Sequence, residues 1–226
     1  MIKAVFMDFY GTAVLEIGPA AIEVIQRIYS TGNAESVEDV IGCWWKVFKE
    51  KQDLANGENF RTQHEVALEC FQELLEHFRS GENAAELLER MELNWRTVEA
   101  FVDTPIFMEQ AGLPVYFVTN SDDHYVFEAV KNNGLHPAGI YTSEQAGYSK
   151  PRQEIFLYAL QKAGVSPDEV VHIGDSLDGD VACPSGLGIK SIWINREKKP
   201  VPEGVCSAGS LMGALRLLDE MKTESE

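Results

Sequence analysis

The stretch Ala4-Val5-Phe6-Met7-Asp8-Phe9-Tyr10-Gly11-Thr12 decides the fold of this chain. Four apolar residues lead directly into one carboxylate, which is the pattern of a buried strand that ends in a polar loop. Gly11 permits a sharp turn directly after this strand. Two later segments repeat the layout, and in an open parallel sheet such strand ends form the ligand-binding edge. We therefore predict a strand over residues 3–9 that brings Asp8 to a functional site.

The chain after Asp103 alternates short apolar strands with helical patterns. The sequence predicts strands over residues 115–118, 139–142, 170–173 and 191–194, and helices over 124–133, 151–163 and 208–221, with Pro151 in the first turn of its helix. Strands that alternate with helices form a parallel sheet with right-handed crossovers. The predicted fold class is therefore α/β.

Residues 16–102 differ from the rest because they contain almost no strand signal. Apolar residues recur there at helical spacing in three groups, which are Ile41, Trp44, Trp45 and Phe48; Leu68, Phe71, Leu75 and Phe78; and Leu88, Met91, Trp95 and Val98. We predict an all-helical insert of three to five helices, and we assign its aromatic stripes to the core of the insert. The predicted domains are residues 1–15 with 103–226, and residues 16–102.

The composition excludes several classes of function. The 226 residues carry a formal net charge of −17, which argues against nucleic acids and anionic membranes as partners, because basic patches supply that affinity. No segment approaches the roughly 18 apolar residues of a membrane span, and the first apolar run ends at Asp8, too early for a signal peptide. The cysteines show no metal-ligand spacing, so we expect reduced thiols in a cytoplasmic protein; they are Cys43, Cys70, Cys183 and Cys206.

Three predicted strands end in polar groups that would share one edge of the sheet. These groups are Asp8; Thr119-Asn120-Ser121; and Gly174-Asp175-Ser176 followed by Asp180. Taken singly, Asp175 and Asp180 are as well explained as loop or helix caps. Together with Asp8 they would repel one another and raise their pKa values, and a hard divalent cation such as Mg²⁺ removes that penalty. Lys150, in the connection after the strand at 139–142, is a candidate for the same edge.

These four motifs, in this order and spacing, resemble the haloacid dehalogenase-like hydrolase superfamily. The resemblance implies a Rossmann-like, doubly wound parallel sheet with a helical cap inserted after the first strand. It implies that Asp8 is the nucleophile, that Lys150 pairs with Asp8 and the anion, and that Thr119, Asn120 and Ser121 bind the substrate. It also implies an Mg²⁺ site formed by Asp8, the Tyr10 backbone carbonyl and Asp175, with Asp180 in support.

Tyr10 departs from the phosphatase branch of the superfamily. That branch usually has an acid–base Asp two residues after the nucleophile, whereas Tyr at this position resembles the metal-independent 2-haloacid dehalogenases. The last motif points the other way, since dehalogenases have a neutral pattern where Gly174-Asp175 stands. A tyrosine hydroxyl, with a pKa of about 10, is a poor base at neutral pH, so we expect substrates with good leaving groups.

Charge decides between the two branches. Asp8, Asp175 and Asp180 carry three negative charges against one positive charge on Lys150, so Mg²⁺ would neutralise the site for a phosphoryl dianion. No arginine near Trp44 and Trp45 fits the halide-binding position of dehalogenases, and Arg61 has the wrong spacing. We predict an Mg²⁺-dependent phosphatase for a small anionic metabolite. A 2-haloacid dehalogenase and a catalytically weak binding or regulatory protein are the alternatives; oligomeric state is left open.

Overall fold

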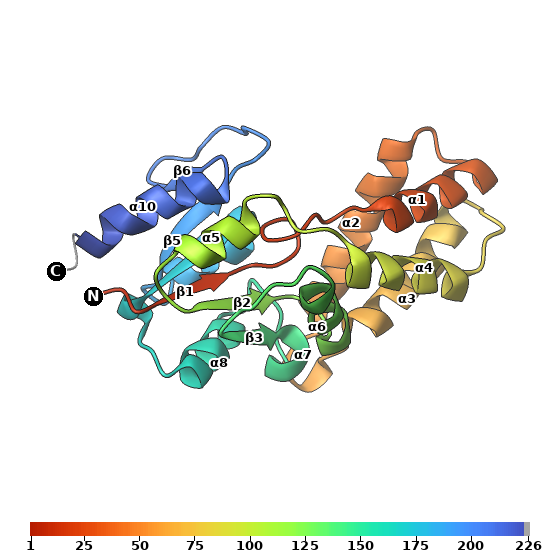
Figure 1. Cartoon of the computed structure of the whole chain (residues 1–226). Coiled ribbons are helices and arrows are strands. Elements are labelled where there is room, and N and C mark those ends of the chain that lie inside the picture. Colours follow the sequence, from red (N-terminus) through yellow and green to blue (C-terminus); the bar gives the residue numbers. More distant parts are fainter. Residues whose placement is uncertain (224–226) are drawn as a thin grey trace.

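The computed structural model describes residues 1–223 and contains a six-stranded parallel sheet, with the order β3-β2-β1-β4-β5-β6 (Figure 1). The strands are β1 (Ala4–Met7), β2 (Val115–Thr119), β3 (Gly139–Thr142), β4 (Val170–Gly174), β5 (Lys190–Ile194) and β6 (Ser207–Ala208). The order reverses direction on either side of β1, which is the doubly wound arrangement. The α/β prediction is therefore confirmed.

Helices cover both faces of the sheet, so its strands are apolar on both sides. One face packs against α5 (Thr104–Gln110), α6 (Asp123–Asn132) and α10 (Leu211–Thr223), which contribute Phe107, Val126 and Leu218 to its core. The other packs against α8 (Gln153–Ala163) through Ile155 and Phe156. The shorter elements are α7 (Ser143–Ala146), η2 (Pro167–Glu169), η3 (Leu177–Ala182) and α9 (Cys183–Ser185).

The helical insert forms a separate bundle beside the sheet (Figure 1). It contains α1 (Pro19–Thr31), α2 (Val37–Leu54), the short η1 (Gly57–Asn59), α3 (Gln63–His77) and α4 (Ala84–Thr97). Its own apolar core includes Phe71, Leu74 and Leu87. The two chain crossings between bundle and sheet lie side by side, since Leu15 N donates to Glu99 O at 2.8 Å and Phe101 N donates to Ala13 O at 3.1 Å.

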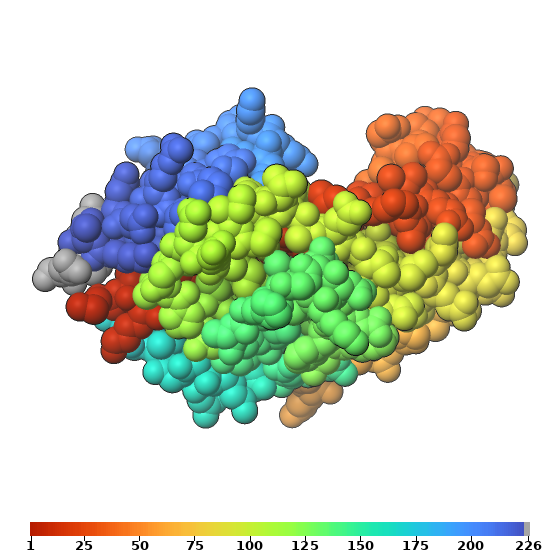
Figure 2. Space-filling model, viewed as in Figure 1, coloured from red at the N-terminus to blue at the C-terminus, as the bar shows by residue number. Residues whose placement is uncertain are grey.

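The bundle is attached to the core mainly along α3 and α4. The carboxylate of Asp122, which follows β2, accepts hydrogen bonds from the backbone N–H groups of Gln63 at 2.6 Å and His64 at 3.0 Å, at the start of α3. Tyr125 of α6 donates its hydroxyl proton to Glu92 of α4 at 2.6 Å. Figure 2 shows a cleft between the two parts, with the N-terminal segment at its base.

The structure corrects two details of the predicted elements. Trp44 and Phe48 are buried in the bundle, but Trp45 is 39% exposed, because consecutive helical residues point about 100° apart and cannot share one face. Pro151 precedes its helix instead of occupying the first turn. It lies in a turn in which Arg152 N donates to Ser149 O at 2.9 Å, and α8 begins at Gln153.

Three further findings concern the rest of the chain. The final helix begins at Leu211, because residues 207–208 pair with β5 as a sixth strand that the sequence analysis did not predict. All four cysteines are unpaired. None of the helices within residues 1–223 is both long and apolar enough to cross a lipid bilayer. The predicted domain boundaries and cytoplasmic location stay predictions.

Candidate active site

A cavity of about 280 Å³ lies between the carboxyl edge of the sheet and the helical cap. Its sheet side contains Asp8, Thr119, Lys150, Asp175 and Asp180, and its cap side is mostly apolar. The arrangement follows from the topology, because β1, β2 and β4 are parallel neighbours and their loops leave the same edge. Four motifs that are distant in the sequence therefore meet in one pocket.

Lys150 is the centre of the charged side of the cavity. Its Nζ donates to Asp8 Oδ1 and to Asp180 Oδ1, both at 2.6 Å, and the three side chains are almost fully buried. Burial alone would lower the pKa of Lys150, but the charges of Asp180 and Asp8 outweigh it and raise that pKa, so the ammonium stays charged. The predicted pairing of Lys150 with Asp8 is thus present in the geometry, while its catalytic role stays a prediction.

The two partners of Lys150 differ in their proton affinity. Burial, together with the charge of Asp180, raises the pKa of Asp8 to about 6 against the opposing effect of Lys150. Burial also acts on Asp180, but Lys150 and His172 outweigh it and hold the pKa of Asp180 below its usual range. His172 Nε2 lies 2.9 Å from Asp180 Oδ1, and Ser176 N donates to Asp180 Oδ2 at 3.0 Å. Asp180 is therefore a permanently ionised anchor for the ammonium.

Asp180 owes its position to Gly174. A side chain on Gly174 would place its Cβ 2.3 Å from Asp180 Cγ, so only glycine lets the carboxylate lie against the end of β4. Gly11 plays a comparable part opposite Asp175. Its φ of +84° favours glycine, and a Cβ there would approach Asp175 Oδ2 to 2.7 Å. Both glycines thus make room for acidic side chains at the sheet edge.

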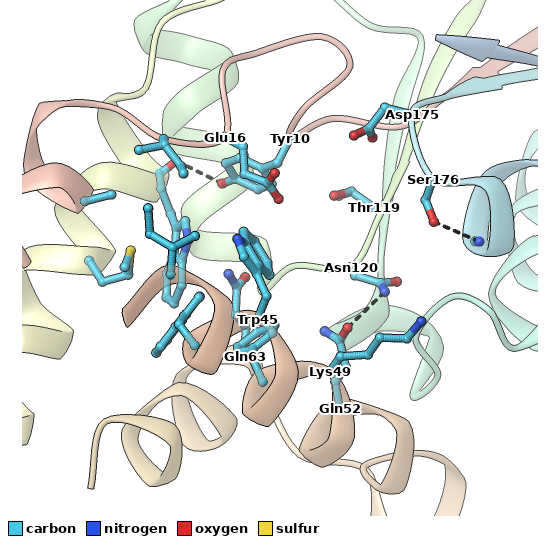
Figure 3. Close-up of a pocket in the computed structure, with 18 of the residues that line it drawn as sticks. Tyr10, Glu16, Trp45, Lys49, Gln52, Gln63, Thr119, Asn120, Asp175 and Ser176 are labelled. Atoms are coloured by element: carbon cyan, nitrogen blue, oxygen red, sulfur yellow. Dashed lines mark hydrogen bonds between the residues drawn. The ribbon is translucent and has the colours of Figure 1, made fainter. Parts of the chain in front are cut away.

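Asp175 lines the cavity close to Asp8 and Asp180, and Figure 3 shows it above Thr119. Thr12 donates its hydroxyl proton to Asp175 Oδ1 at 3.2 Å, and the Trp193 indole N–H donates to Asp175 O at 2.8 Å. Burial and the neighbouring carboxylates of Asp8 and Asp180 raise the pKa of Asp175 to about 8. Without a cation beside it, this acid is therefore mostly protonated at neutral pH, and a bound cation would favour its ionised form.

The chemistry of this cluster suits a hard cation. Carboxylate oxygens of Asp8, Asp175 and Asp180 lie within 4.8 Å of one another, close enough to share one ion. Mg²⁺ prefers oxygen ligands and is commonly held by one or two carboxylates together with phosphate oxygens. The raised pKa of Asp175 shows that Lys150 alone does not compensate the three acids. The residues therefore fit Mg²⁺; the Tyr10 carbonyl as a further ligand stays a prediction.

The three polar residues after β2 have different surroundings. Thr119 is buried and lines the cavity, and Figure 3 shows it across the pocket from Tyr10. Asn120 holds the Lys150 segment, since its Nδ2 donates to Lys150 O at 2.9 Å and its Oδ1 accepts from Lys150 N at 2.6 Å. Ser121 donates to Gln63 Oε1 of the cap at 2.9 Å. Of these three residues, Thr119 and Asn120 line the cavity and Ser121 does not, and the contact of Ser121 with substrate stays a prediction.

Tyr10 is engaged with the cap. Its hydroxyl donates to the backbone carbonyl of Trp95 at 2.9 Å, and its ring packs edge-on against Phe9 with the centroids 5.0 Å apart. Burial raises the pKa of Tyr10 well above its ordinary value. The phenol is therefore neutral at physiological pH and its proton is already directed at a carbonyl oxygen, which makes it unsuited to general acid–base catalysis.

Several residues of the site were not found from the sequence. His172 supports Asp180 from within β4, and the one signal for it was a polar residue in an otherwise apolar strand. Glu16 reaches the cavity from the segment between β1 and α1, next to Tyr10 in Figure 3. Gln52 and Gln63 approach from the cap, and no local pattern distinguishes them from other polar residues on helix surfaces.

Comparisons with known proteins agree with this site. The model of the family described as haloacid dehalogenase-like hydrolase matches residues 2–183. The chain is 28% identical over 167 residues to the putative HAD-hydrolase YfnB of Bacillus subtilis, covering 70% of this chain and 67% of that one. It is 26% identical over 190 residues to a phosphoserine phosphatase of Thermus thermophilus, covering 81% and 68%. The chain therefore belongs to the haloacid dehalogenase-like hydrolases, and it is a hydrolase.

Solved structures show the same fold. The L-2-haloacid dehalogenase RSc1362 superimposes with a TM-score of 0.83 at 16% identity, over 96% of this chain and 99% of that one. A crystal structure of YfnB bound to magnesium superimposes with a TM-score of 0.78 at 20% identity, over 96% and 99%. At such identities the likeness establishes the fold, and the reaction must be argued from the site.

Proposed function

We propose that this chain is an Mg²⁺-dependent phosphohydrolase in which Asp8 is the nucleophile. The observation that carries the proposal is the group of three carboxylates around one buried ammonium, with Asp175 as the acid that Lys150 does not compensate. A dehalogenase has no use for this extra negative charge, because its substrate is itself a carboxylate. Bound Mg²⁺ would supply positive charge for the phosphoryl oxygens, and the magnesium in the YfnB structure supports this assignment.

The side chains suggest how the reaction proceeds. Lys150 holds Asp8 Oδ1, which orients the carboxylate for in-line attack on phosphorus. The new oxygen–phosphorus bond forms as the bond to the leaving group breaks, which gives an aspartyl-phosphate. Attack of water on phosphorus then releases phosphate and restores the Asp8 carboxylate. Lys150 and the Thr119 hydroxyl are placed to stabilise charge on the phosphoryl oxygens in both steps.

The state of Tyr10 restricts the substrates. Because its hydroxyl donates to Trp95 O, it is not available to protonate a departing alkoxide. General acid–base assistance is typically worth about 10²–10⁴-fold in rate. We therefore propose that substrates with stable leaving groups, such as acyl, enol or aryl phosphates, are hydrolysed well and simple alkyl phosphates slowly.

The absence of an arginine disfavours the dehalogenase reaction. Among residues 1–223 no arginine lines the cavity, and Arg61 instead pairs with Glu69 at 2.6 Å on α3. The cations at the cavity are Lys150 and Lys49, and both are paired with carboxylates. A 2-haloacid carboxylate would therefore meet a pocket in which both ammonium groups already face carboxylates.

Phosphate release from acetyl phosphate and p-nitrophenyl phosphate tests the proposal. We expect hydrolysis with Mg²⁺, its loss in EDTA, and its loss in Asp8→Asn. Asp53→Asn is the matched control, because Asp53 is an exposed acid at the rim of the same cavity. Activity that survives Asp8→Asn would refute the nucleophile, and chloride release from 2-chloropropionate in EDTA would establish the dehalogenase reaction instead.

A further inference from the structure

The cavity has two chemically different halves. The sheet half carries the acids and Lys150, whereas the cap half is lined by apolar side chains from all four helices of the bundle, among them Ile25, Ile41, Trp44, Trp45 and Met91. A cavity of roughly 150 Å³ accommodates a benzene molecule. The volume of about 280 Å³ therefore leaves room for a ring-sized group beside a phosphoryl group.

Two large apolar side chains of the cap half remain partly uncovered. Trp45 is 39% exposed and Ile17 is 38% exposed, although both line the cavity. Trp45 packs edge-on against Phe48 with the ring centroids 6.4 Å apart, and Figure 3 shows its indole on the cap side of the pocket, opposite Asp175. An apolar group that filled this half would remove both side chains from water, which is favourable in proportion to the area covered.

The charges of the cavity exclude a second anionic group on the substrate. Lys150 is occupied by Asp8 and Asp180, and the Lys49 ammonium lies 3.6 Å from Asp178. Glu16 lies on the path from the sheet edge towards the apolar half. A carboxylate or second phosphate on the leaving group would approach Glu16, whose pKa burial raises to about 7, so repulsion acts above that pH, and the exposed Lys49 ammonium already faces Asp178.

Two polar side chains of the cap, Gln52 and Gln63, already make hydrogen bonds to the sheet edge. The carboxamide oxygen of Gln52 accepts from Asn120 at 3.3 Å, and that of Gln63 accepts from Ser121 at 2.9 Å. These contacts join the cap to the sheet edge and engage both carboxamide oxygens, so fewer acceptors remain there for the hydroxyls of a sugar or polyol. Burying unpaired hydroxyls is costly, so such substrates gain little from this half of the cavity.

We propose that the cap half binds an uncharged apolar leaving group, aromatic or branched aliphatic, so that the substrates are phosphate esters or acyl phosphates of apolar phenols, enols or acids. This inference rests on the proposed phosphohydrolase activity and adds the substrate class to it. It also agrees with Tyr10, because phenolate and carboxylate leaving groups do not need the proton that Tyr10 cannot supply.

Non-hydrolysable phosphonates separate this inference from the reaction itself. The full chain with Mg²⁺ is titrated with methylphosphonate, phenylphosphonate, 2-carboxyethylphosphonate and 2-aminoethylphosphonate. Affinities are measured by tryptophan fluorescence and as inhibition constants against acetyl phosphate. We expect phenylphosphonate to bind about 10-fold or more tightly than methylphosphonate, in proportion to the apolar area covered, and the carboxyethyl compound to bind more weakly than methylphosphonate. Tightest binding of the carboxyl or amino compound would overturn the inference.

Variants assign the effect to named side chains. Trp45→Ala should reduce the preference for phenyl over methyl, whereas Tyr29→Ala should not, because Tyr29 is an equally exposed aromatic residue of the bundle outside the cavity, at 38%. Glu16→Gln should reduce the penalty on the carboxyl compound. If acetyl phosphate is hydrolysed but phenylphosphonate and methylphosphonate bind equally well, the apolar site is refuted and the phosphohydrolase activity is not. Absence of Mg²⁺-dependent hydrolysis would refute the phosphohydrolase, and the fluorescence titration would still report the apolar preference.

Discussion

Replacing Lys150 by methionine should strongly destabilise the fold. The side chains of Lys150, Asp8 and Asp180 are 6%, 9% and 1% exposed, so the Lys150 ammonium compensates two buried carboxylates in the metal-free protein. Breaking a buried ion pair by removing one partner typically costs about 3–5 kcal/mol. We expect a loss of this size in the free energy of unfolding at about pH 8 in EDTA.

The pH dependence of this loss follows from Asp8. Its pKa already lies at about 6 in the folded protein, and removal of Lys150 raises it further. For an acid whose folded pKa lies above the unfolded value, the contribution to stability is present at low pH and is lost as pH rises through the folded pKa. A proton on Asp8 then partly replaces the ammonium, so the destabilisation should be smaller at about pH 5.5, by up to about 1.4 kcal/mol per pH unit.

Urea unfolding followed by tryptophan fluorescence measures both effects. Lys131→Met is the matched control, because Lys131 is an exposed lysine of α6 and should change little. A loss below about 1 kcal/mol for Lys150→Met at about pH 8, the size expected of an exposed pair, would refute the view that Lys150 balances two buried acids.

Three other predictions address the metal, the acid–base group and the cap. Because the pKa of Asp175 is raised to about 8, protons compete with Mg²⁺ below that value, and calorimetric titration should show binding that tightens by up to about 10-fold per pH unit and levels off above it. Affinity that does not vary with pH would contradict this. Tyr10→Asp should raise turnover of alkyl phosphates by about 10²–10⁴-fold and that of acetyl phosphate far less. Equal changes for both substrates would show that a missing general acid is not the reason for slow hydrolysis of alkyl phosphates. Asp122→Ala removes two hydrogen bonds that join the start of α3, whose N-cap is Thr62, to the core, and should cost about 1–3 kcal/mol in urea unfolding and raise KM. Asn83→Ala removes the N-cap of α4 inside the bundle and is the control, because it should also lower stability but leave KM unchanged.

The charged half of the site was predictable because it depends on local patterns and one topological rule. Strands that end at Asp8, Thr119 and Gly174 must deliver their loops to the same edge once they are parallel neighbours. Lys150 is 142 positions from Asp8 in the chain, yet its place after β3 was enough to assign it to that edge. The superfamily resemblance is likewise confirmed by the family model.

The cap half was not predictable in the same way. Helical periodicity shows that α2 has an apolar face, but it does not show which apolar residues face the bundle and which face the cavity. Trp44 and Trp45 are adjacent in sequence and both line the cavity, but Trp44 is 8% exposed and belongs to the bundle core, whereas Trp45 is 39% exposed. The hydrogen bond of Tyr10 to Trp95 joins residues 85 positions apart, and that of Gln63, at the start of α3, to Asp122 joins residues 59 positions apart. Neither contact leaves a local signal in the sequence.

The contacts that α3 makes with the core differ in burial from the ion pair at the C-terminal part of α2. At α3, the buried Asp122 carboxylate accepts two backbone hydrogen bonds, which are charge-assisted and shielded from water. At the C-terminal end of α2 and in the turn after it, the cap meets the core through hydrogen bonds of Gln52, Asn56 and Gly57. It also meets the core there through the ion pair of Lys49 with Asp178, whose side chains are 63% and 61% exposed. An exposed ion pair of this kind contributes at most about 1 kcal/mol and is screened by salt. Rising ionic strength therefore weakens the Lys49–Asp178 ion pair and leaves in place the hydrogen bonds by which both α3 and the end of α2 are joined to the core.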